Sequence, residues 1–343
     1  MPRTLPLFAL ATLLPVPLLL LGALAGWHWA LAAILYITVG VFALDELAPR
    51  TPGPAASPAG ANALSAILAL LHLPLMGLAV LALAGTFGAG PADRLAVFFA
   101  FGLWLGQVGN ANAHELIHRR HPLLRGLGAA VFTAHLFGHH ATAHPAIHHR
   151  FVATPDDPNT ARRGEGFWRF WPRAAAGSFG AGWRVEATRL IHRGRSPWHP
   201  ANPYWRYLGG ALALMLLALA AAGPAGWAAF VALALYAQMQ LMLSDYVQHY
   251  GLIRPRGADG RYAPVSPAQS WDAAHWMSGL FTLNAPRHAD HHSHATRPFP
   301  ALAACPDAPR LPGPLPVMAT LALIPRAWRR VMDPRLDRLG RAT

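Results

Sequence analysis

Six apolar runs constrain the fold of this chain more than any other feature. They cover roughly residues 5–25, 28–44, 63–85, 94–113, 206–222 and 225–246. A helix needs about 20 apolar residues to cross the hydrocarbon of a bilayer, and its backbone polar groups must be paired within the protein. We therefore expect an all-α, polytopic membrane protein with about six transmembrane helices. No separable second domain is visible, so residues 1–343 are predicted to form a single membrane-embedded domain.

The composition agrees with this interpretation. Hydrophobic residues make up 54% of the 343 residues and charged residues only 13%, which leaves too little polar surface for a soluble globule of this size. A shorter apolar stretch at 124–138 predicts a re-entrant or interfacial helix. The first run follows Arg3 and imitates a secretory signal with a cleavage site. The second run follows almost at once, so we favour a helical hairpin without cleavage.

The positive charges indicate how the chain is oriented. The net charge of +13 comes from arginine, and residues 119–195 hold twelve arginines against four acids, whereas the connections near 25, 88 and 224 are almost uncharged. Arginine-rich loops favour the cytoplasmic side. We therefore expect a multi-pass protein of the cell inner membrane. No aromatic residues are interleaved with a basic stripe, so nucleic acid is not expected as a partner.

Nine histidines form four clusters that lie near the apolar runs. The first cluster is HELIH, the second HPAIHH, the third DYVQHYGL and the fourth RHADHH. The nine are His114, His118, His144, His148, His149, His249, His288, His291 and His292. They supply enough imidazole for two metal ions. Because ionisable groups near a membrane are costly and usually functional, we expect a di-metal site at the cytosolic membrane surface.

Helical spacing explains how these clusters can bind metal. Residues four apart share a helix face, so both histidines of the first cluster can reach one ion. Successive turns of about 100° place the three histidines of the fourth cluster within an arc of about 100°. Those of the second cluster spread over about 140°, and Pro145 suits a first helical turn that begins there. Joint occurrence of two such triplets with HELIH favours ligation over a structural role.

The remaining histidines are less informative. Five lie close to the clusters, and among them His139, His140 and His275 could support or replace a ligand; the other two are His135 and His294. Five more lie apart and are expected to be surface or structural residues: His28, His72, His121, His192 and His199. The lone Cys305 cannot form an internal disulfide.

Ligand chemistry alone does not choose the metal, because imidazole suits zinc, copper, nickel and iron. HELIH also matches the HExxH pattern, in which two histidines bind zinc and Glu115 would be the general base. An intramembrane zinc protease is therefore an alternative of a different class. Such an enzyme needs about three protein ligands, which leaves six of the nine histidines unexplained. Two ions use all of them.

A longer series of motifs resembles one family. It comprises NAHELIHRR (112–120), HHRFVATPDDP (148–158), HYGL (249–252), DGRYAP (259–264), RHADHHSHATRPFP (287–300) and IPRAWRRVMDP (324–334). The chain resembles the integral-membrane non-haem di-iron alkane monooxygenases, relatives of the membrane fatty-acid desaturases. The resemblance assigns the second cluster to the histidines ahead of VATPDDP and leaves His139 and His140 as extras. Departures at Ala143, Asp245 and Gln248 bear on substrate range.

The resemblance implies O2-dependent terminal hydroxylation of medium-chain n-alkanes to 1-alkanols at two iron ions, with electrons from rubredoxin or a ferredoxin-like donor. Zinc has no redox chemistry and could not oxidise a methyl group. We expect the alkane to arrive from the membrane lipid through a channel between spans such as 94–113 and 225–246. Three acids are expected to hydrogen-bond ligand N–H groups and offset the charge of the ions: Glu115, Asp245 and Asp290.

Several alternatives stay open at this point. A membrane di-iron desaturase, or another lipid or hydrocarbon hydroxylase, would carry the same histidines. An aromatic or terpenoid substrate is also compatible with the sequence, and neither the oligomeric state nor the partition of the histidines between the two ions follows from it.

Overall fold

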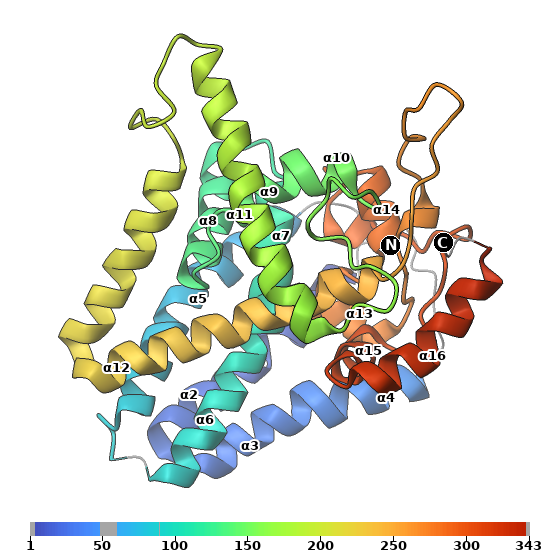
Figure 1. Cartoon of the computed structure of the whole chain (residues 1–343). Coiled ribbons are helices and arrows are strands. Elements are labelled where there is room, and N and C mark those ends of the chain that lie inside the picture. Colours follow the sequence, from blue (N-terminus) through green and yellow to red (C-terminus); the bar gives the residue numbers. More distant parts are fainter. Residues whose placement is uncertain (1–3, 49–59, 89, 341–343) are drawn as a thin grey trace.

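The computed structural model describes residues 4–48, 60–88 and 90–340, and within these ranges the chain forms helices and no strand (Figure 1). Two isolated bridges, Arg256 with Tyr262 and Asp272 with Arg310, are the nearest approach to a sheet in the described chain. The predicted all-α class is confirmed.

The elements before residue 152 build the first part of the bundle. They are α1 (Thr4–Leu13), α2 (Pro15–Ala25), α3 (Trp27–Leu35), η1 (Tyr36–Gly40), α4 (Val41–Leu47), α5 (Ala61–Ala84), α6 (Pro91–Trp104), η2 (Leu105–Gly109), α7 (Asn110–Ile117), α8 (Pro122–Ala134), α9 (His140–Ala143), η3 (His144–His148) and α10 (His149–Phe151). The N-terminal helices pack into the bundle, where the Trp104 indole donates to the Thr12 carbonyl at 2.8 Å.

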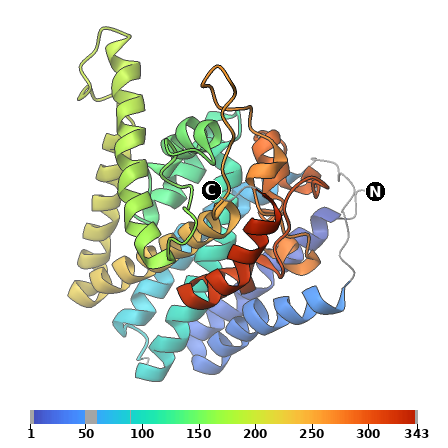
Figure 2. The same cartoon turned by 45° about the vertical axis from the view of Figure 1, so that its right-hand side comes forward.

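The elements after residue 152 complete it. They are α11 (Phe167–Ile191), α12 (Tyr204–His249), η4 (Pro267–Gln269), α13 (Trp276–Phe281), α14 (His288–Ser293), η5 (Phe299–Ala301), α15 (Leu315–Ala322) and α16 (Pro325–Arg338). In both views the α11–α12 connection and the loop before η4 project from the side of the molecule that holds α10 and α14 (Figures 1 and 2).

Four helical segments are long and apolar enough to cross a membrane, which agrees with a membrane protein. They are Leu5–Ala25, Trp27–Leu47, Ala61–Ala84 and Tyr204–His249. The run predicted at 94–113 lies on α6, η2 and α7, which follow one another without a break. The stretch predicted to be a short interfacial helix is α8, a 13-residue apolar helix.

The two runs predicted at 206–222 and 225–246 are the two arms of α12. The backbone leaves helical geometry at Ala222 and at Gly223, where φ is +63°. Glycine tolerates this left-handed conformation without a Cβ clash. Pro224 follows, and its fixed φ suits the first turn of the second arm. The arms diverge at this kink (Figure 1), so the second arm leads back toward the centre of the molecule.

Three π-helical segments interrupt the helices of the described chain, and the second and third lie in helices that carry predicted ligands. They are η1, η2 and η3, and the last of these holds His144, Pro145 and His148. A π turn closes i→i+5 hydrogen bonds and is frequent at functional sites. The prediction that a helix begins at Pro145 is wrong, because α9 already starts at His140. The wider turn accommodates a proline inside the helix because the bonding pattern has shifted there.

Candidate metal centre

Four separate parts of the chain carry the nine predicted histidines to one place. His114 lies in the last turn of α7 and His118 directly follows that helix. The second cluster lies on η3 and the start of α10, His249 ends α12, and the fourth cluster lies on α14. Most of these side chains are buried. The structure thus gathers all nine, which sort into two groups by distance.

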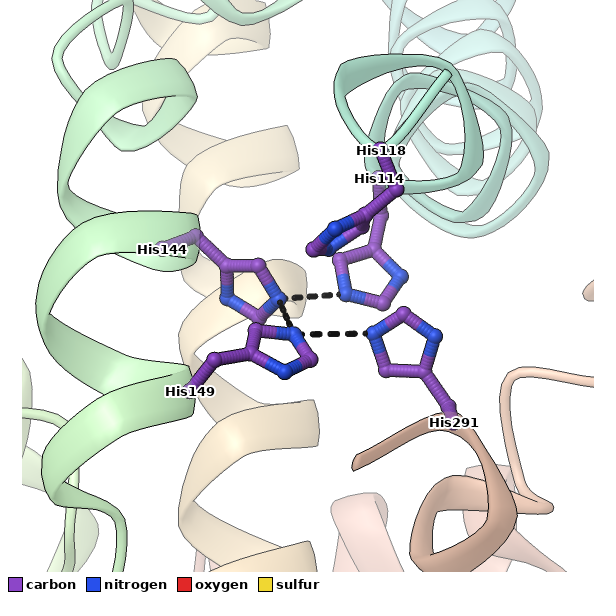
Figure 3. Close-up of side chains that lie close together, drawn as sticks. All are labelled: His114, His118, His144, His149 and His291. Atoms are coloured by element: carbon purple, nitrogen blue, oxygen red, sulfur yellow. Dashed lines mark hydrogen bonds between the residues drawn. The ribbon is translucent and has the colours of Figure 1, made fainter. Parts of the chain in front are cut away.

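The five-histidine group consists of His114, His118, His144, His149 and His291, and one ring nitrogen of each lies within 4.8 Å of the others. The rings point toward one another from three helical segments (Figure 3). The Nε2 atom of His144 lies 2.7 Å from that of His114 and 3.0 Å from that of His149. The Nε2 atoms of His149 and His291 are also 3.0 Å apart.

The four-histidine group consists of His148, His249, His288 and His292, again with one ring nitrogen of each within 4.8 Å of the others. All four side chains are buried. The Nε2 atom of His288 lies 3.1 Å from those of His249 and His292.

The π turn explains how the second cluster divides between the groups. In an α-helix residues four apart share a face, so His144 would pair with His148. A π turn instead brings residues five apart into register, and His144 and His149 accordingly join one group while His148 joins the other. On α14, by contrast, the i,i+4 pair His288 and His292 stays together.

Hydrogen bonds fix the orientation of two rings in the four-histidine group. His148 Nδ1 lies 2.8 Å from Asp157 Oδ2, and His249 Nδ1 lies 3.0 Å from the Gln269 carbonyl. Because Nδ1–H must donate to these acceptors, Nε2 of each ring is left as the atom free to bind metal. The buried Nε2 of His148 has no hydrogen-bond partner in the described structure.

The charge of Asp157 acts on His148 as well. Burial lowers the pKa of His148, but the charge and hydrogen bond of Asp157 outweigh it and raise the pKa above its usual value. Burial and the neighbouring rings instead hold the pKa of His144 well below its usual range, which favours the neutral ring. Neutral imidazole is the form that binds metal, so a metal ion at Nε2 of His148 has to displace the proton that Asp157 stabilises there.

Sequence reasoning missed Asp157 as a ligand-supporting residue, although it lies in the VATPDDP motif directly after the second cluster. Asp157 is itself held in place, since its carboxylate accepts from Thr160 Oγ1 at 2.7 Å and from the Asn159 amide at 3.0 Å. Gln269 was also missed, and no sequence signal marks a residue that contributes only its backbone carbonyl.

The three acids predicted to hydrogen-bond the ligands bond elsewhere in the described structure. Glu115 pairs with Arg119 and accepts from the Phe299 amide at 3.0 Å. Asp245 accepts from Asn159 at 2.6 Å.

Asp290, the third of the acids predicted to bond the ligands, pairs with Arg297 at 2.5 Å and with His294 at 2.9 Å. The expected bonds from these three acids to ligand N–H groups are therefore replaced by bonds to neighbouring side chains and amides. An influence of their charge on the metal centre stays a prediction.

The nearby histidines fall outside both groups. His140 is buried beside His144, with ring centroids 4.8 Å apart, and its ring stacks on Phe137. His139 lies within hydrogen-bond distance of Ser178 at 3.2 Å. His275 is buried at the start of α13. Their role as alternate ligands or supporting groups stays a prediction.

A cavity of about 300 Å³ opens beside the histidines. Its walls come from the second span (Trp27–Leu47), from the continuous helix formed by α6, η2 and α7, from α12 and from α15, and they reach His114 of one group and His288 of the other. Its apolar lining includes Val41, Leu103, Tyr236, Met239, Leu243 and Val317.

Two of the polar side chains that line this cavity donate to backbone carbonyls. Gln240 donates to the Gly102 carbonyl at 2.8 Å, and Gln248 donates to the Ala285 carbonyl at 3.0 Å. Gly106 makes room for Gln240, since a Cβ at residue 106 would lie 2.0 Å from the Gln240 amide nitrogen. These two amides are already bonded and most of the lining residues are apolar, so the cavity presents a mostly apolar surface to a ligand.

The geometry defines a helical membrane protein with two histidine-rich metal-binding groups beside an apolar cavity. Residues 92–314 match the family model described as "Fatty acid desaturase". An alkane 1-monooxygenase of Pseudomonas putida is 35% identical over 252 residues, which cover 74% of this chain and 62% of the relative. Alkane 1-monooxygenase 1 of Pseudomonas aeruginosa is 35% identical over 276 residues, covering 79% and 72%.

Alkane 1-monooxygenase 2 of the same species is 31% identical over 321 residues, covering 90% of this chain and 84% of the relative. The chain belongs to the fatty acid desaturase family and, within it, to the alkane 1-monooxygenases. The resemblance drawn from the motifs is thereby confirmed. The chain spans slightly less than two thirds of the first relative's length and more of the other two.

Proposed function

We propose that this protein hydroxylates the terminal carbon of medium-chain n-alkanes, with O2 as oxidant and two iron ions held by the nine histidines. The observation that carries the proposal is the position of the apolar cavity, which reaches His114 of the five-histidine group and His288 of the four-histidine group. A substrate in this cavity would lie beside both groups.

The donor set fits a pair of metal ions. Nine imidazoles converge in two groups, in each of which the ring nitrogens lie within 4.8 Å of one another. Buried nitrogens such as His118 Nε2 and His148 Nε2 have no hydrogen-bond partner in the described structure. Unpaired buried nitrogens are costly, and a cation between them removes that cost. The relatives are named as monooxygenases, which favours iron over zinc because zinc has no redox chemistry.

The reaction is R–CH3 + O2 + 2 e⁻ + 2 H⁺ → R–CH2OH + H2O. Reduced iron supplies the activation of O2 that no amino-acid side chain can provide. The protein holds the ligand rings through Asp157 and Gln269. The side chains of α12 and of the second span orient the alkane end-on, and the apolar walls exclude water from its methyl group.

The cavity also has a suitable length. Leu103 precedes His114 by 11 residues along continuous helix, which corresponds to roughly 16 Å at about 1.5 Å per residue. An extended medium-chain alkane fits such a path. In this proposal residues 1–343 act as one membrane-embedded domain, since the helices before residue 92 form part of the cavity wall.

The electrons come, in this proposal, from rubredoxin or a ferredoxin-like donor on the cytoplasmic side of the inner membrane. The arginine-rich segments between residues 119 and 195 support that orientation. A basic cytosolic face would also attract an acidic electron-transfer protein.

The test is 18O2 labelling in membranes that contain the protein, a generic reductase and an electron-transfer protein. Octane should give 1-octanol that carries one labelled oxygen, and the purified protein should contain iron. An alkene from an acyl substrate would indicate a desaturase, and selective oxidation of a methylbenzene or a terpene would change the substrate class. Zinc without iron, together with peptide cleavage, would overturn the proposal.

A further inference from the structure

A second cavity, of about 870 Å³, lies apart from the one beside the metal centre. Its walls come from α8, from the helix that contains Pro145, from the end of α11 and from the start of α12. These elements lie on the same side of the molecule as the α11–α12 connection (Figure 1). The proposed alkane reaction does not use this cavity.

One end of the cavity is positively charged. Arg125 of α8, Arg189 of α11 and Arg206 of α12 line it, together with a single acid, Glu186. Glu186 accepts from Arg189 at 2.8 Å. In the part of the chain that the structure describes, Arg125 and Arg206 make no side-chain hydrogen bond or ion pair. Two guanidinium groups thus remain available to bind an anion.

The other end of the cavity is apolar and lined by small side chains. Ala129 and Ala130 follow Arg125 on α8, and Gly210 and Ala213 follow Arg206 on α12. On each helix the small residues lie one to two turns after the arginine, on the same face. Leu73 of α5 and Leu214 of α12 also line the cavity. Polarity therefore changes in the same order along both helices, from charged to apolar.

Two tryptophans indicate the depth of the charged end. Trp205, next to Arg206, has an exposed fraction of 43%, and its indole donates to the Trp198 carbonyl at 3.2 Å. Trp198 is 65% exposed. Exposed tryptophans collect at the level of lipid headgroups. The arginines thus lie at headgroup depth, and the small residues that follow along α12 lie within the first predicted arm of a membrane span.

We propose that this cavity binds one anionic phospholipid, with the phosphate on Arg125 and Arg206 and an acyl chain along the small residues of α8 and α12. Arginine pairs with phosphate through two parallel N–H donors, and basic pockets between membrane helices recognise anionic headgroups. The excess of arginine over acid disfavours a zwitterionic lipid. Free phosphate or an acidic polypeptide would bind only at the arginines and would leave the apolar end of the cavity empty.

The bound lipid would pack against the back of the helix that carries the second histidine cluster. Thr142, Pro145 and Ala146 line the cavity, and they alternate along the chain with His144 and His148. Thr142 is joined to Glu186 at 3.2 Å and to Tyr207 at 3.1 Å. An occupied cavity would therefore brace this helix from the side opposite to the metal groups.

The experiment measures lipid retention by the full chain. Protein exchanged into bilayer nanodiscs of phosphatidylglycerol or of phosphatidylcholine is extracted and examined by native mass spectrometry and by thermal unfolding. The wild type should retain one phosphatidylglycerol and gain thermal stability from it. Arg125→Gln with Arg206→Gln should weaken retention about thirtyfold, since each arginine near an anionic surface contributes about 1 kcal/mol.

Matched variants separate charge from fold. Arg193→Gln with Arg195→Gln removes two exposed arginines outside the cavity and should retain lipid as the wild type does. Arg125→Lys with Arg206→Lys should also keep most of it. Ala213→Phe fills the apolar end and should reduce retention without any change in charge.

Three results would overturn the proposal. The first is equal retention of phosphatidylcholine and phosphatidylglycerol, and the second is unchanged retention after both arginines are replaced by glutamine. The third is a thermal shift with inorganic phosphate, or with an acidic polypeptide, as large as that with phosphatidylglycerol.

Discussion

The two histidine groups differ in how firmly the surrounding protein holds them. In the four-histidine group every side chain is buried, and Asp157 and Gln269 fix two of the rings. In the five-histidine group His114, His118 and His149 are partly exposed. The short Nε2–Nε2 distances described above join members of this group to one another.

This difference has a chemical consequence. Rings that are oriented by a carboxylate or a carbonyl bind metal more tightly and in one geometry. The four-histidine group is thus the more rigid site, and the five-histidine group is the more adaptable one. Both still contribute a residue to the cavity wall, His288 and His114 respectively, so both are expected to be needed for the reaction.

The largest expected effect comes from removing one ligand in each group. His291→Ala and His292→Ala should each abolish oxygen incorporation into octane, and each variant should keep about one of the two irons, because the other group stays intact. Iron analysis and 18O2 labelling measure these outcomes. His294→Ala, at an exposed neighbour of the same cluster, is the control. Full activity in His291→Ala would refute its role as a ligand.

A second change should separate the groups by affinity. Asp157→Asn removes the charge that orients His148 and should weaken metal binding in the four-histidine group about 10- to 100-fold. Metal titration of the apoprotein measures this. Asp156→Asn, at the exposed adjacent acid, should leave both affinities unchanged. If Asp157→Asn released metal from the five-histidine group first, the proposed difference in rigidity would be incorrect.

A third change concerns the cavity that both groups share. Leu103→Ala should lengthen it at the end far from His114 and shift the product ratio from octane toward dodecane by roughly tenfold, since each methylene in an apolar pocket contributes about 1–3 kcal/mol to discrimination. Competition between the two alkanes in one assay gives the ratio. Leu95→Ala, at a position of α6 with an exposed fraction of 60%, should leave the ratio unchanged. An unaltered ratio in Leu103→Ala would place the alkane elsewhere.

The smallest expected effect should fall on both groups alike. Asp272 accepts the Ala289 amide at 2.8 Å and so caps α14, which carries histidines of both groups. Asp272→Ala should lower the stability of the protein by about 1 kcal/mol, as loss of a helix cap does. Thermal unfolding with simultaneous iron release tests this, and Asp272→Asn should retain most of the stability. Release of iron from one group alone would contradict a shared cap.

Much of this protein could be predicted from local patterns. The apolar runs indicate membrane spans because hydrocarbon demands helices of a fixed length, and HELIH places His114 and His118 together because residues four apart share a helix face. The nine histidines were identified in the same way, with the family motifs assigning the second cluster.

Other features depended on the path of the chain. No residue pattern in the sequence indicates a π turn. The assignment of His144 and His149 to one group and of His148 to the other could therefore not be predicted. Asp157 was overlooked since it lies nine positions after His148, and only the turn through Pro155 returns it to the ring. The acids predicted instead, Glu115 and Asp290, are adjacent in sequence to ligands but face arginines.

The sequence by itself determined that this chain spans a membrane and carries imidazole for two ions, because hydrophobicity and helical spacing are properties of short segments. Only the tertiary structure decided which histidines join which group, which carboxylate orients a ring, and where the two cavities lie. These depend on distances between segments that are far apart in the sequence, and such distances are set by packing, which short-range patterns do not record.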